Sequence, residues 1–246
     1  MTITLPKHIL KACMEFFKAA NAAKVPAVLI GGGALGMHGL LERRTTKDLD
    51  INVGREILTQ AFKSRIHIVE RKQKQDEPGT WLWREDLRED EIHVHATYLS
   101  GGMYDVSFDI KIPHPKHPQQ QELLDTFVTF SQRREGIRFA DLGPLLATKT
   151  VAVVSRGVSL VEKQETDGED FEMTLLAMLD RKQKMPKQVA KLLLKPPVLR
   201  AFLNLNLYKN YGSFLTEIDV EVNEQQAQAS STRIDAVGSN GGNNQS

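Results

Sequence analysis

The chain of 246 residues contains a single cysteine, Cys13, and no long hydrophobic run. One thiol cannot form a disulfide within the chain, so the sequence excludes a disulfide-stapled scaffold and favours a reducing compartment. No apolar run approaches the roughly 18 residues that a membrane span requires, and the N-terminus lacks the apolar stretch and cleavage site of a signal peptide. We therefore expect a soluble, cytoplasmic protein with no membrane partner.

The chain also has no large excess of positive or negative charge, because 32 basic and 31 acidic residues leave a formal net charge of +1. Such a balance creates no global field towards polyanions, so the net charge does not indicate nucleic-acid binding. A basic stretch at residues 181 to 200 has no interleaved aromatic residue, and a solvated helix face explains it as well as contact with RNA does. Hydrophobic residues make up 41% of the chain, which is enough to bury a core.

Hydrophobic periodicity predicts both helices and strands in the first part of the chain. Apolar residues at steps of three and four predict a helix over residues 6 to 23, and a shorter helix is expected over 34 to 42. A charged stretch between residues 71 and 90 contains a Pro78-Gly79 turn, with Trp81 and Trp83 on one face of an extended run. Continuous or alternating apolar residues predict strands at residues 25 to 30, 48 to 53, 65 to 70, 91 to 99 and 104 to 112.

From about residue 141 the pattern becomes helical, and helices are predicted at residues 142 to 156, 168 to 183 and 186 to 208, the last with a break at Pro196 and Pro197. From about residue 223 the chain is rich in Gln, Asn, Ser and Gly, which predicts a disordered tail. The fold class we predict is α/β, of the α+β type, with a mixed sheet flanked by helices and then a helical C-terminal region. We expect an α/β domain over residues 1 to 140, a helical region packed on it over 141 to 222, and the tail over 223 to 246.

Three consecutive glycines, Gly31, Gly32 and Gly33, follow the first predicted strand. Backbone without side chains, at a strand-to-helix junction, can bring its amides close to an anion such as phosphate. With Gly36 these residues also spell the G-x-G-x-x-G pattern of dinucleotide-binding proteins. That fold, however, places one acid at the end of the second strand and continues with further βαβ units, whereas here paired acids open the strand. Dinucleotide binding is therefore the lesser alternative.

Asp48 and Asp50 alternate on the strand predicted over residues 48 to 53. A step of two puts both carboxylates on one strand face, about 7 Å apart at Cα. Two carboxylates so placed can converge on one divalent cation or on a metal pair. Together with the glycine loop, they predict a nucleoside triphosphate, such as ATP, bound with Mg²⁺ or Mn²⁺.

The stretch over residues 31 to 53 resembles the nucleotidyltransferases of the DNA polymerase β superfamily, especially the small group that includes abortive-infection toxin enzymes. Their signature is a Gly-Gly loop at a helix start, followed by an aspartate pair on the next strand. In that group the loop often continues as Gly-Gly-x-Ala-Leu, and the strand is preceded by Arg-x-Thr/Ser-x-Asp-x-Asp. The corresponding residues here are Gly31-Gly32-Gly33-Ala34-Leu35 and Arg44-Thr45-Thr46-Lys47-Asp48-Leu49-Asp50.

The resemblance implies roles for these residues. Asp48 and Asp50 would bind the metal and take part in catalysis, and the nucleotide would be bound by Gly31, Gly32, Gly33, Arg44, Thr46 and Lys149. Family members that transfer nucleotides also have a third metal-binding acid on a neighbouring strand. Asp105 and Asp109 compete for this role, and we favour Asp109 because a position in mid-strand holds a side chain more rigidly.

The helical half resembles the same family more weakly, because Lys149, Arg156, Lys163 and Asp170 follow one another in the order that is common there. Lys149 and Arg156 are seven residues apart and share one helix face, so both can meet a triphosphate. A solvated helix face is the alternative explanation.

The function implied is a metal-dependent nucleotidyltransferase, which moves a nucleoside monophosphate from a triphosphate to a hydroxyl acceptor and releases pyrophosphate. The acceptor can be a small molecule, a protein or an RNA. The alternative is a non-catalytic member of the same fold that binds a nucleotide or a partner, and a missing third carboxylate would favour it.

His93 and His95 alternate on one predicted strand, and His114 and His117 bracket a proline-containing turn. Such histidines allow a zinc site to be considered. Because no cysteine cluster or helical histidine pair accompanies them, we interpret them as part of a solvated strand face.

If residues 223 to 246 are a disordered tail, a chain that ends after residue 222 should melt at nearly the temperature of the full chain, because the removed segment buries no core. Differential scanning calorimetry of both chains measures this. A drop of many degrees would identify the tail as a docked segment.

Overall fold

A computed structural model describes residues 2–41, 46, 48–70, 77–101, 104–156 and 161–222. The chain divides into two compact units, Met1–Leu145 and Leu146–Ser246, and each is described by itself. Two predictions, the nucleotide contact of Arg44 and the tail over residues 223 to 246, lie outside the described residues.

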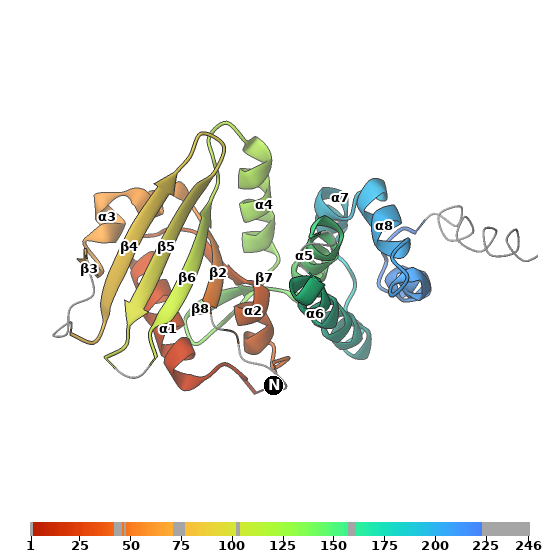
Figure 1. The fold of residues 1–246 in the computed structure, drawn as a ribbon, viewed down its shortest axis with the longest axis horizontal. Helices are drawn as coiled ribbons and strands as arrows, with labels where there is room; N and C mark the ends of the chain where they lie inside the picture. The colour runs from red at the N-terminus through yellow and green to blue at the C-terminus, as the bar shows by residue number, and fades with distance from the viewer. Residues whose placement is uncertain are drawn as a thin grey trace, which may run out of the picture. The chain divides into compact units, whose positions relative to one another are not determined.

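The first unit is built on an eight-stranded mixed sheet in the order β3-β4-β5-β6-β2-β1-β8-β7 (Figure 1). Its strands are β1 (Ala27–Ile30), β2 (Asp48–Val53), β3 (His67–Val69), β4 (Thr80–Leu87), β5 (Ile92–Leu99), β6 (Val106–Ile112), β7 (Ser131–Arg134) and β8 (Ile137–Ala140). Its helical segments are α1 (Lys7–Ala22), α2 (Gly31–Met37), η1 (Arg55–Leu58), α3 (Gln60–Lys63) and α4 (Pro118–Thr129). The predicted fold class, a mixed sheet with helices followed by a helical region, is confirmed.

Several elements of this unit differ from the sequence-based expectation. The helix expected over residues 34 to 42 begins earlier, at Gly31, and ends at Met37. The charged stretch contains a full strand, β4, whose hydrogen-bonding partner is β5 along its whole length. The sequence also gave no sign of α4 or of the β7–β8 hairpin, because α4 starts with polar residues and β7 consists of them.

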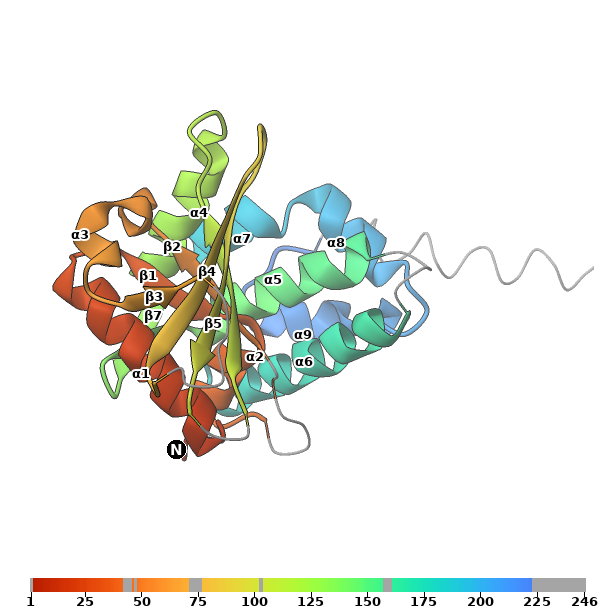
Figure 2. The same cartoon turned by 60° about the vertical axis from the view of Figure 1, so that its left-hand side comes forward.

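One face of the sheet is apolar and carries the core. On β2 the side chains of Leu49 and Ile51 are fully buried. From α1, Phe16 stacks on Phe108 with ring centroids 5.6 Å apart and also contacts Trp81. Figure 2 shows α1 lying along this face of the sheet. Asp48 and Asp50 belong to the opposite face, since side chains alternate along a strand.

The direction of the first two strands decides between the two glycine-loop hypotheses. β1 and β2, which α2 connects, pair in antiparallel fashion, with Ile30 opposite Asp50. A dinucleotide-binding unit requires the corresponding strands to be parallel, with a helix crossing between them. The structure therefore excludes the dinucleotide-binding alternative.

The second unit is helical. It contains the C-terminal part of α5 (Leu142–Ser155), then α6 (Val161–Asp180), α7 (Lys187–Leu193), α8 (Pro196–Leu203), η3 (Lys209–Tyr211) and α9 (Gly212–Glu217). The predicted break at Pro196 and Pro197 separates α7 from α8, because Pro196 occupies the first turn of α8, where its missing amide costs no hydrogen bond. Phe171, Phe202 and Tyr208 form an aromatic core, with centroids 4.7 Å and 4.5 Å apart between successive rings.

Within the described parts of the chain, no helix combines the length and apolarity needed to cross a membrane.

The packing beneath the aspartates yields a matched test on two leucines of the same sheet. Leu49 is completely buried, whereas Leu87 is 61% exposed. We expect Leu49→Ala to lower the free energy of unfolding by about 2–5 kcal/mol, because it removes buried methyl groups and leaves a cavity. Leu87→Ala should change it by less than about 0.5 kcal/mol. Urea denaturation of both variants measures the difference, and equal losses would contradict the assignment of the apolar face.

Candidate functional site

Asp48 and Asp50 of β2 and Asp109 of β6 belong to the polar face of the sheet. β2 and β6 are parallel neighbours, and their register places Asp50 beside Asp109 and Asp48 beside Ser107. Neighbouring strands lie about 4.8 Å apart, so Asp50 and Asp109 are side by side. Asp105, the competing acid, precedes the first residue of β6 and has no partner position on β2. The register therefore brings Asp109, and not Asp105, to the aspartate pair.

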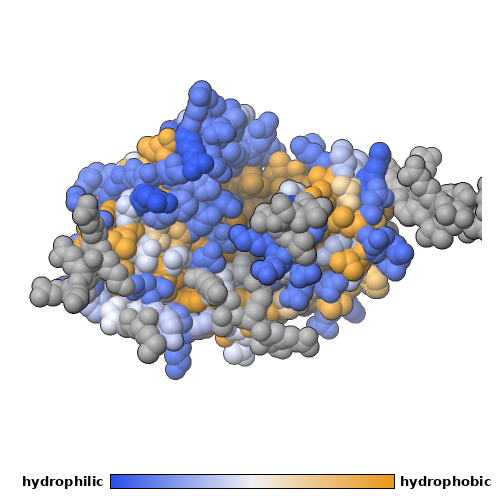
Figure 3. Space-filling view, in the orientation of Figure 1, coloured by the Kyte–Doolittle hydropathy of each residue, from blue (hydrophilic) through white to orange (hydrophobic). Residues whose placement is uncertain are grey.

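The strand register extends this face into two charged rows that cross four strands. Figure 3, in which the face towards the viewer lies over β4, β5 and β6, shows hydrophilic residues gathered on its upper part. One row consists of Asp50, Asp109, His95 and Arg84, and the other of Asn52, Lys111, His93 and Asp86. In the first row the two acids are neighbours on β2 and β6, and an imidazole and a guanidinium follow them on β5 and β4.

Gly31 lies directly against Asp50. Its φ of +59° is a left-handed conformation that L side chains rarely adopt, and a Cβ on it would lie 2.5 Å from Asp50 Oδ2. Gly33 meets a different constraint, because a Cβ there would lie 2.8 Å from both Leu29 Cδ1 and Leu49 Cδ2. Gly32 is buried within α2. Of the three predicted phosphate-binding glycines, Gly31 thus borders the site, while Gly33 allows α2 to pack against the core.

Thr46 fixes the start of β2. Its side chain is buried, and its hydroxyl donates a hydrogen bond of 2.7 Å to the Asp48 carbonyl oxygen. This bond holds the backbone that carries Asp48. Thr46, predicted as a nucleotide-binding residue, is therefore placed to position the strand.

Two histidines that sequence reasoning assigned to a solvated face lie beside Asp109. Asp109 Oδ1 is 3.3 Å from His93 Nδ1 and 3.8 Å from His95 Nδ1. Asp109 Oδ2 is 4.0 Å from Lys111 Nζ. The alternation of His93 and His95 was visible in the sequence, but the pairing of β5 with β6 that brings them to Asp109 was not.

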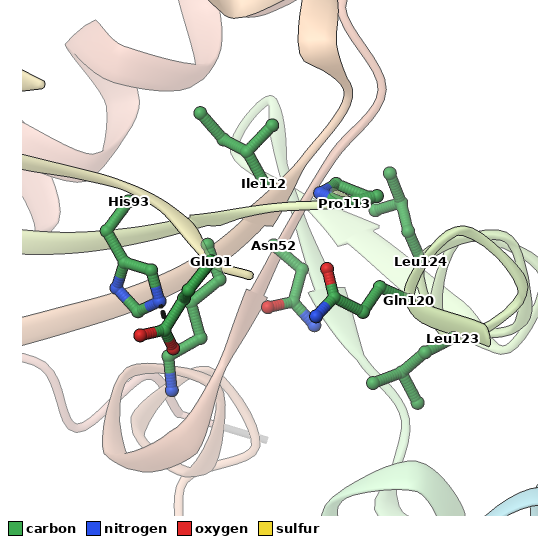
Figure 4. Close-up of a pocket in the computed structure, with 9 residues that line it drawn as sticks. Asn52, Glu91, His93, Ile112, Pro113, Gln120, Leu123 and Leu124 are labelled. Atoms are coloured by element: carbon green, nitrogen blue, oxygen red, sulfur yellow. Dashed lines mark ion pairs between the residues drawn. The ribbon is translucent and has the colours of Figure 1, made fainter. Parts of the chain in front are cut away.

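A pocket of about 190 Å³ opens at the end of these rows, where α4 approaches the polar face (Figure 4). Asn52 and Gln120 lie near its centre, with Leu123 and Leu124 on the α4 side and Glu91 and His93 on the sheet side. Side-chain amides and one apolar wall suit a small polar group with an apolar flank. This pocket lies next to the carboxylates, on the same sheet face.

The cations predicted in the helical half belong to a compact ionic cluster in the second unit. Lys149 Nζ lies 2.7 Å from Asp167 Oδ1 and 2.6 Å from Asp170 Oδ2, and Arg156 Nε lies 2.5 Å from Asp167 Oδ2. Lys149 and Arg156 thus share a helix face, as predicted, and their partners are carboxylates of α6. The cluster is largely buried, so the loss of one member would leave uncompensated charge.

No protein-family model matches the chain, and no curated protein matches it in sequence. Among solved structures, the chain is similar to an antigenic nucleotidyltransferase-like protein from Paracoccidioides brasiliensis. The two are 13% identical, the match covers 89% of this chain and 96% of that chain, and the TM-score is 0.49. Similarity at this level assigns no role to any residue.

Two glycines with positive φ, Gly31 and Gly136, allow the effect of the close contact with Asp50 to be distinguished from the effect of backbone strain. Gly136 also has a positive φ, of +77°, but a Cβ there would meet nothing within 4 Å. We expect Gly31→Ala to lower the melting temperature more than Gly136→Ala, because only the first substitution adds a clash with Asp50 to the strain of the left-handed conformation. Calorimetry of the two variants tests this, and equal losses would show that Gly31 makes no close approach to the carboxylate.

Proposed function

We propose that this protein is a metal-dependent nucleotidyltransferase, which transfers a nucleoside monophosphate from a triphosphate to a hydroxyl acceptor and releases pyrophosphate. The observation that carries the proposal is the register of β2 with β6. It places Asp109 beside Asp50, so the paired aspartates of the family-like motif have a third carboxylate on the same face.

Asp48 is exposed, and Asp50 and Asp109 are partly exposed, so the place proposed for a hard divalent cation is not sealed from solvent. Carboxylate oxygens are the donors that Mg²⁺ and Mn²⁺ prefer. Asp48, Asp50 and Asp109 would hold the metal. When bound, it supplies charge neutralisation for the triphosphate and stabilises the attacking and leaving oxygens.

The residues of the chain contribute orientation and proton transfer. The absence of a side chain at Gly31 keeps the space beside Asp50 free, where a side chain would collide with its carboxylate. Asp109 takes the proton of the acceptor hydroxyl as general base. The pocket with Asn52 and Gln120 accepts part of the acceptor, because its amides can donate to and accept from hydroxyl groups.

The acceptor belongs to one of three classes, a small molecule, a protein or an RNA, since one fold serves different acceptors. The alternative was a member of the same fold that binds a nucleotide or a partner without catalysis. A missing third carboxylate would have favoured that alternative. The position of Asp109 beside Asp50 supports the enzyme.

Substitution of the paired acids tests the proposed chemistry. Asp48→Asn and Asp50→Asn keep the side-chain shape and remove one charge each, so each should reduce Mg²⁺-dependent turnover by roughly 100-fold or more. Turnover is measured as pyrophosphate release from each nucleoside triphosphate with pools of small molecules, proteins and RNA as acceptors. Asp125→Asn, an exposed carboxylate of α4, is the charge-matched control and should retain the parent's rate.

Stability in a chelator provides the second measurement on the same variants. Neighbouring carboxylates repel each other without a metal, so both Asn variants should be at least as stable as the parent in chelator. They should also gain less from added Mg²⁺ and triphosphate. Variants that melt far lower in chelator and keep the full gain would identify Asp48 and Asp50 as structural residues.

A further inference from the structure

Two imidazoles and one carboxylate converge on the polar face, next to the aspartate pair. His93 and His95 leave the same face of β5, and the register of β5 with β6 sets His95 directly opposite Asp109. Their ligand-type atoms all lie within 4.8 Å of one another. His95 and Asp109 come from the middle of β5 and β6, and His93 is the second residue of β5, so backbone pairing holds all three positions.

The distances suit a single metal ion between the three groups. Asp109 Oδ1 lies 3.3 Å from His93 Nδ1 and 3.8 Å from His95 Nδ1. Two ligands of a tetrahedral zinc ion, each about 2.0–2.1 Å from the metal, are themselves about 3.4 Å apart. The distance to His93 matches this spacing, and the distance to His95 is slightly longer.

Glu91 orients one of the imidazoles. Its Oε1 lies 2.7 Å from His93 Nε2, on the side of the ring away from Asp109. When Nε2–H donates to this carboxylate, the lone pair of Nδ1 points towards Asp109. Histidines that bind metals characteristically donate their other ring N–H to a carboxylate or carbonyl in this way.

The surroundings favour a cation. The depression over these residues measures about 260 Å³ and is lined by Asp86, Arg88, Glu91, His93, His95 and Asp109. Its one guanidinium, that of Arg88, pairs with Asp86 at 2.7 Å. Lys111 lies near Asp109 Oδ2, whereas Asp109 Oδ1 faces the two histidines. Lys111 is also about half exposed and can move towards solvent.

We propose that His93, His95 and Asp109 bind a divalent transition-metal ion of the zinc class, with Glu91 as the carboxylate that orients His93. Imidazole nitrogens select Zn²⁺ and its neighbours over Mg²⁺, which prefers oxygen ligands. The site is thus distinct in chemistry from the proposed magnesium site, although both use Asp109. Binding of this ion requires neither a triphosphate nor turnover.

Titration of the full chain with Co²⁺, the spectroscopic substitute for Zn²⁺, tests this proposal. One equivalent should produce the visible absorption of a low-coordinate Co²⁺ with nitrogen ligands. Zn²⁺ should displace the Co²⁺, and excess Mg²⁺ should not. His93→Gln and His95→Gln should abolish the absorption, and Glu91→Gln should weaken Zn²⁺ affinity by roughly 10–100-fold.

His67→Gln is the matched control, because His67 is an exposed histidine of β3 in the same unit. It should retain the absorption and the affinity of the parent. Circular dichroism melts establish that each variant is folded before titration. The proposal is overturned if the parent binds no stoichiometric Co²⁺, or if folded His93→Gln and His95→Gln variants bind it as the parent does.

Asp48→Asn separates this proposal from the proposed function. It should keep Co²⁺ binding at the histidines while losing Mg²⁺-dependent transfer. If no transfer is found in the parent but Co²⁺ binding follows the histidines, the transferase proposal fails and the transition-metal site stands.

Discussion

The parallel register between β2 and β6 is the constraint on which the rest of the site depends. It sets Asp50 beside Asp109 on one face while Leu49 and Phe108 are neighbours on the other. Because side chains alternate with a period of two, a slip by one residue would turn the aspartates into the aromatic core and expose the leucine. Burial of the apolar face therefore holds the carboxylates in place, and the position of the charges is set by hydrophobic packing beneath them.

The polar face collects charge without burying it. The carboxylates of Asp50 and Asp109 are followed across the sheet by His95 and Arg84, and these four side chains are partly or fully exposed. Full burial of such groups would cost several kcal/mol for each ion. The buried cluster around Lys149 is the contrasting case, because its carboxylates already have cationic partners.

Asp109 stands at the junction of two ligand sets with different preferences. Towards β2 its neighbour is a carboxylate, and an all-oxygen set suits Mg²⁺ or Mn²⁺. Towards β5 its neighbours are imidazoles, and a mixed nitrogen and oxygen set suits Zn²⁺. In the arrangement we propose, the two metals compete for one side chain. The availability of a transition metal would then bear on the nucleotide chemistry without any change in fold.

The sequence alone determined the local features of this protein: helix α1, strands β2 and β6, and the pairing of Asp48 with Asp50 on one face, because each follows from a short-range period. The sequence favoured Asp109 over Asp105 only because a residue in the middle of a strand is held more rigidly than one near its end. The tertiary structure decided which strands are neighbours, and therefore that Asp109 adjoins Asp50, that His93 and His95 reach Asp109, and that Gly31 lies against a carboxylate. It also supplied α4 and the β7–β8 hairpin, whose many polar residues carry no clear period, and it extended the run around Trp81 and Trp83 into the full strand β4. Paired strands bring together residues that are far apart in the chain. Strands pair through backbone hydrogen bonds, which every residue type can form, so the sequence does not show which strands are neighbours.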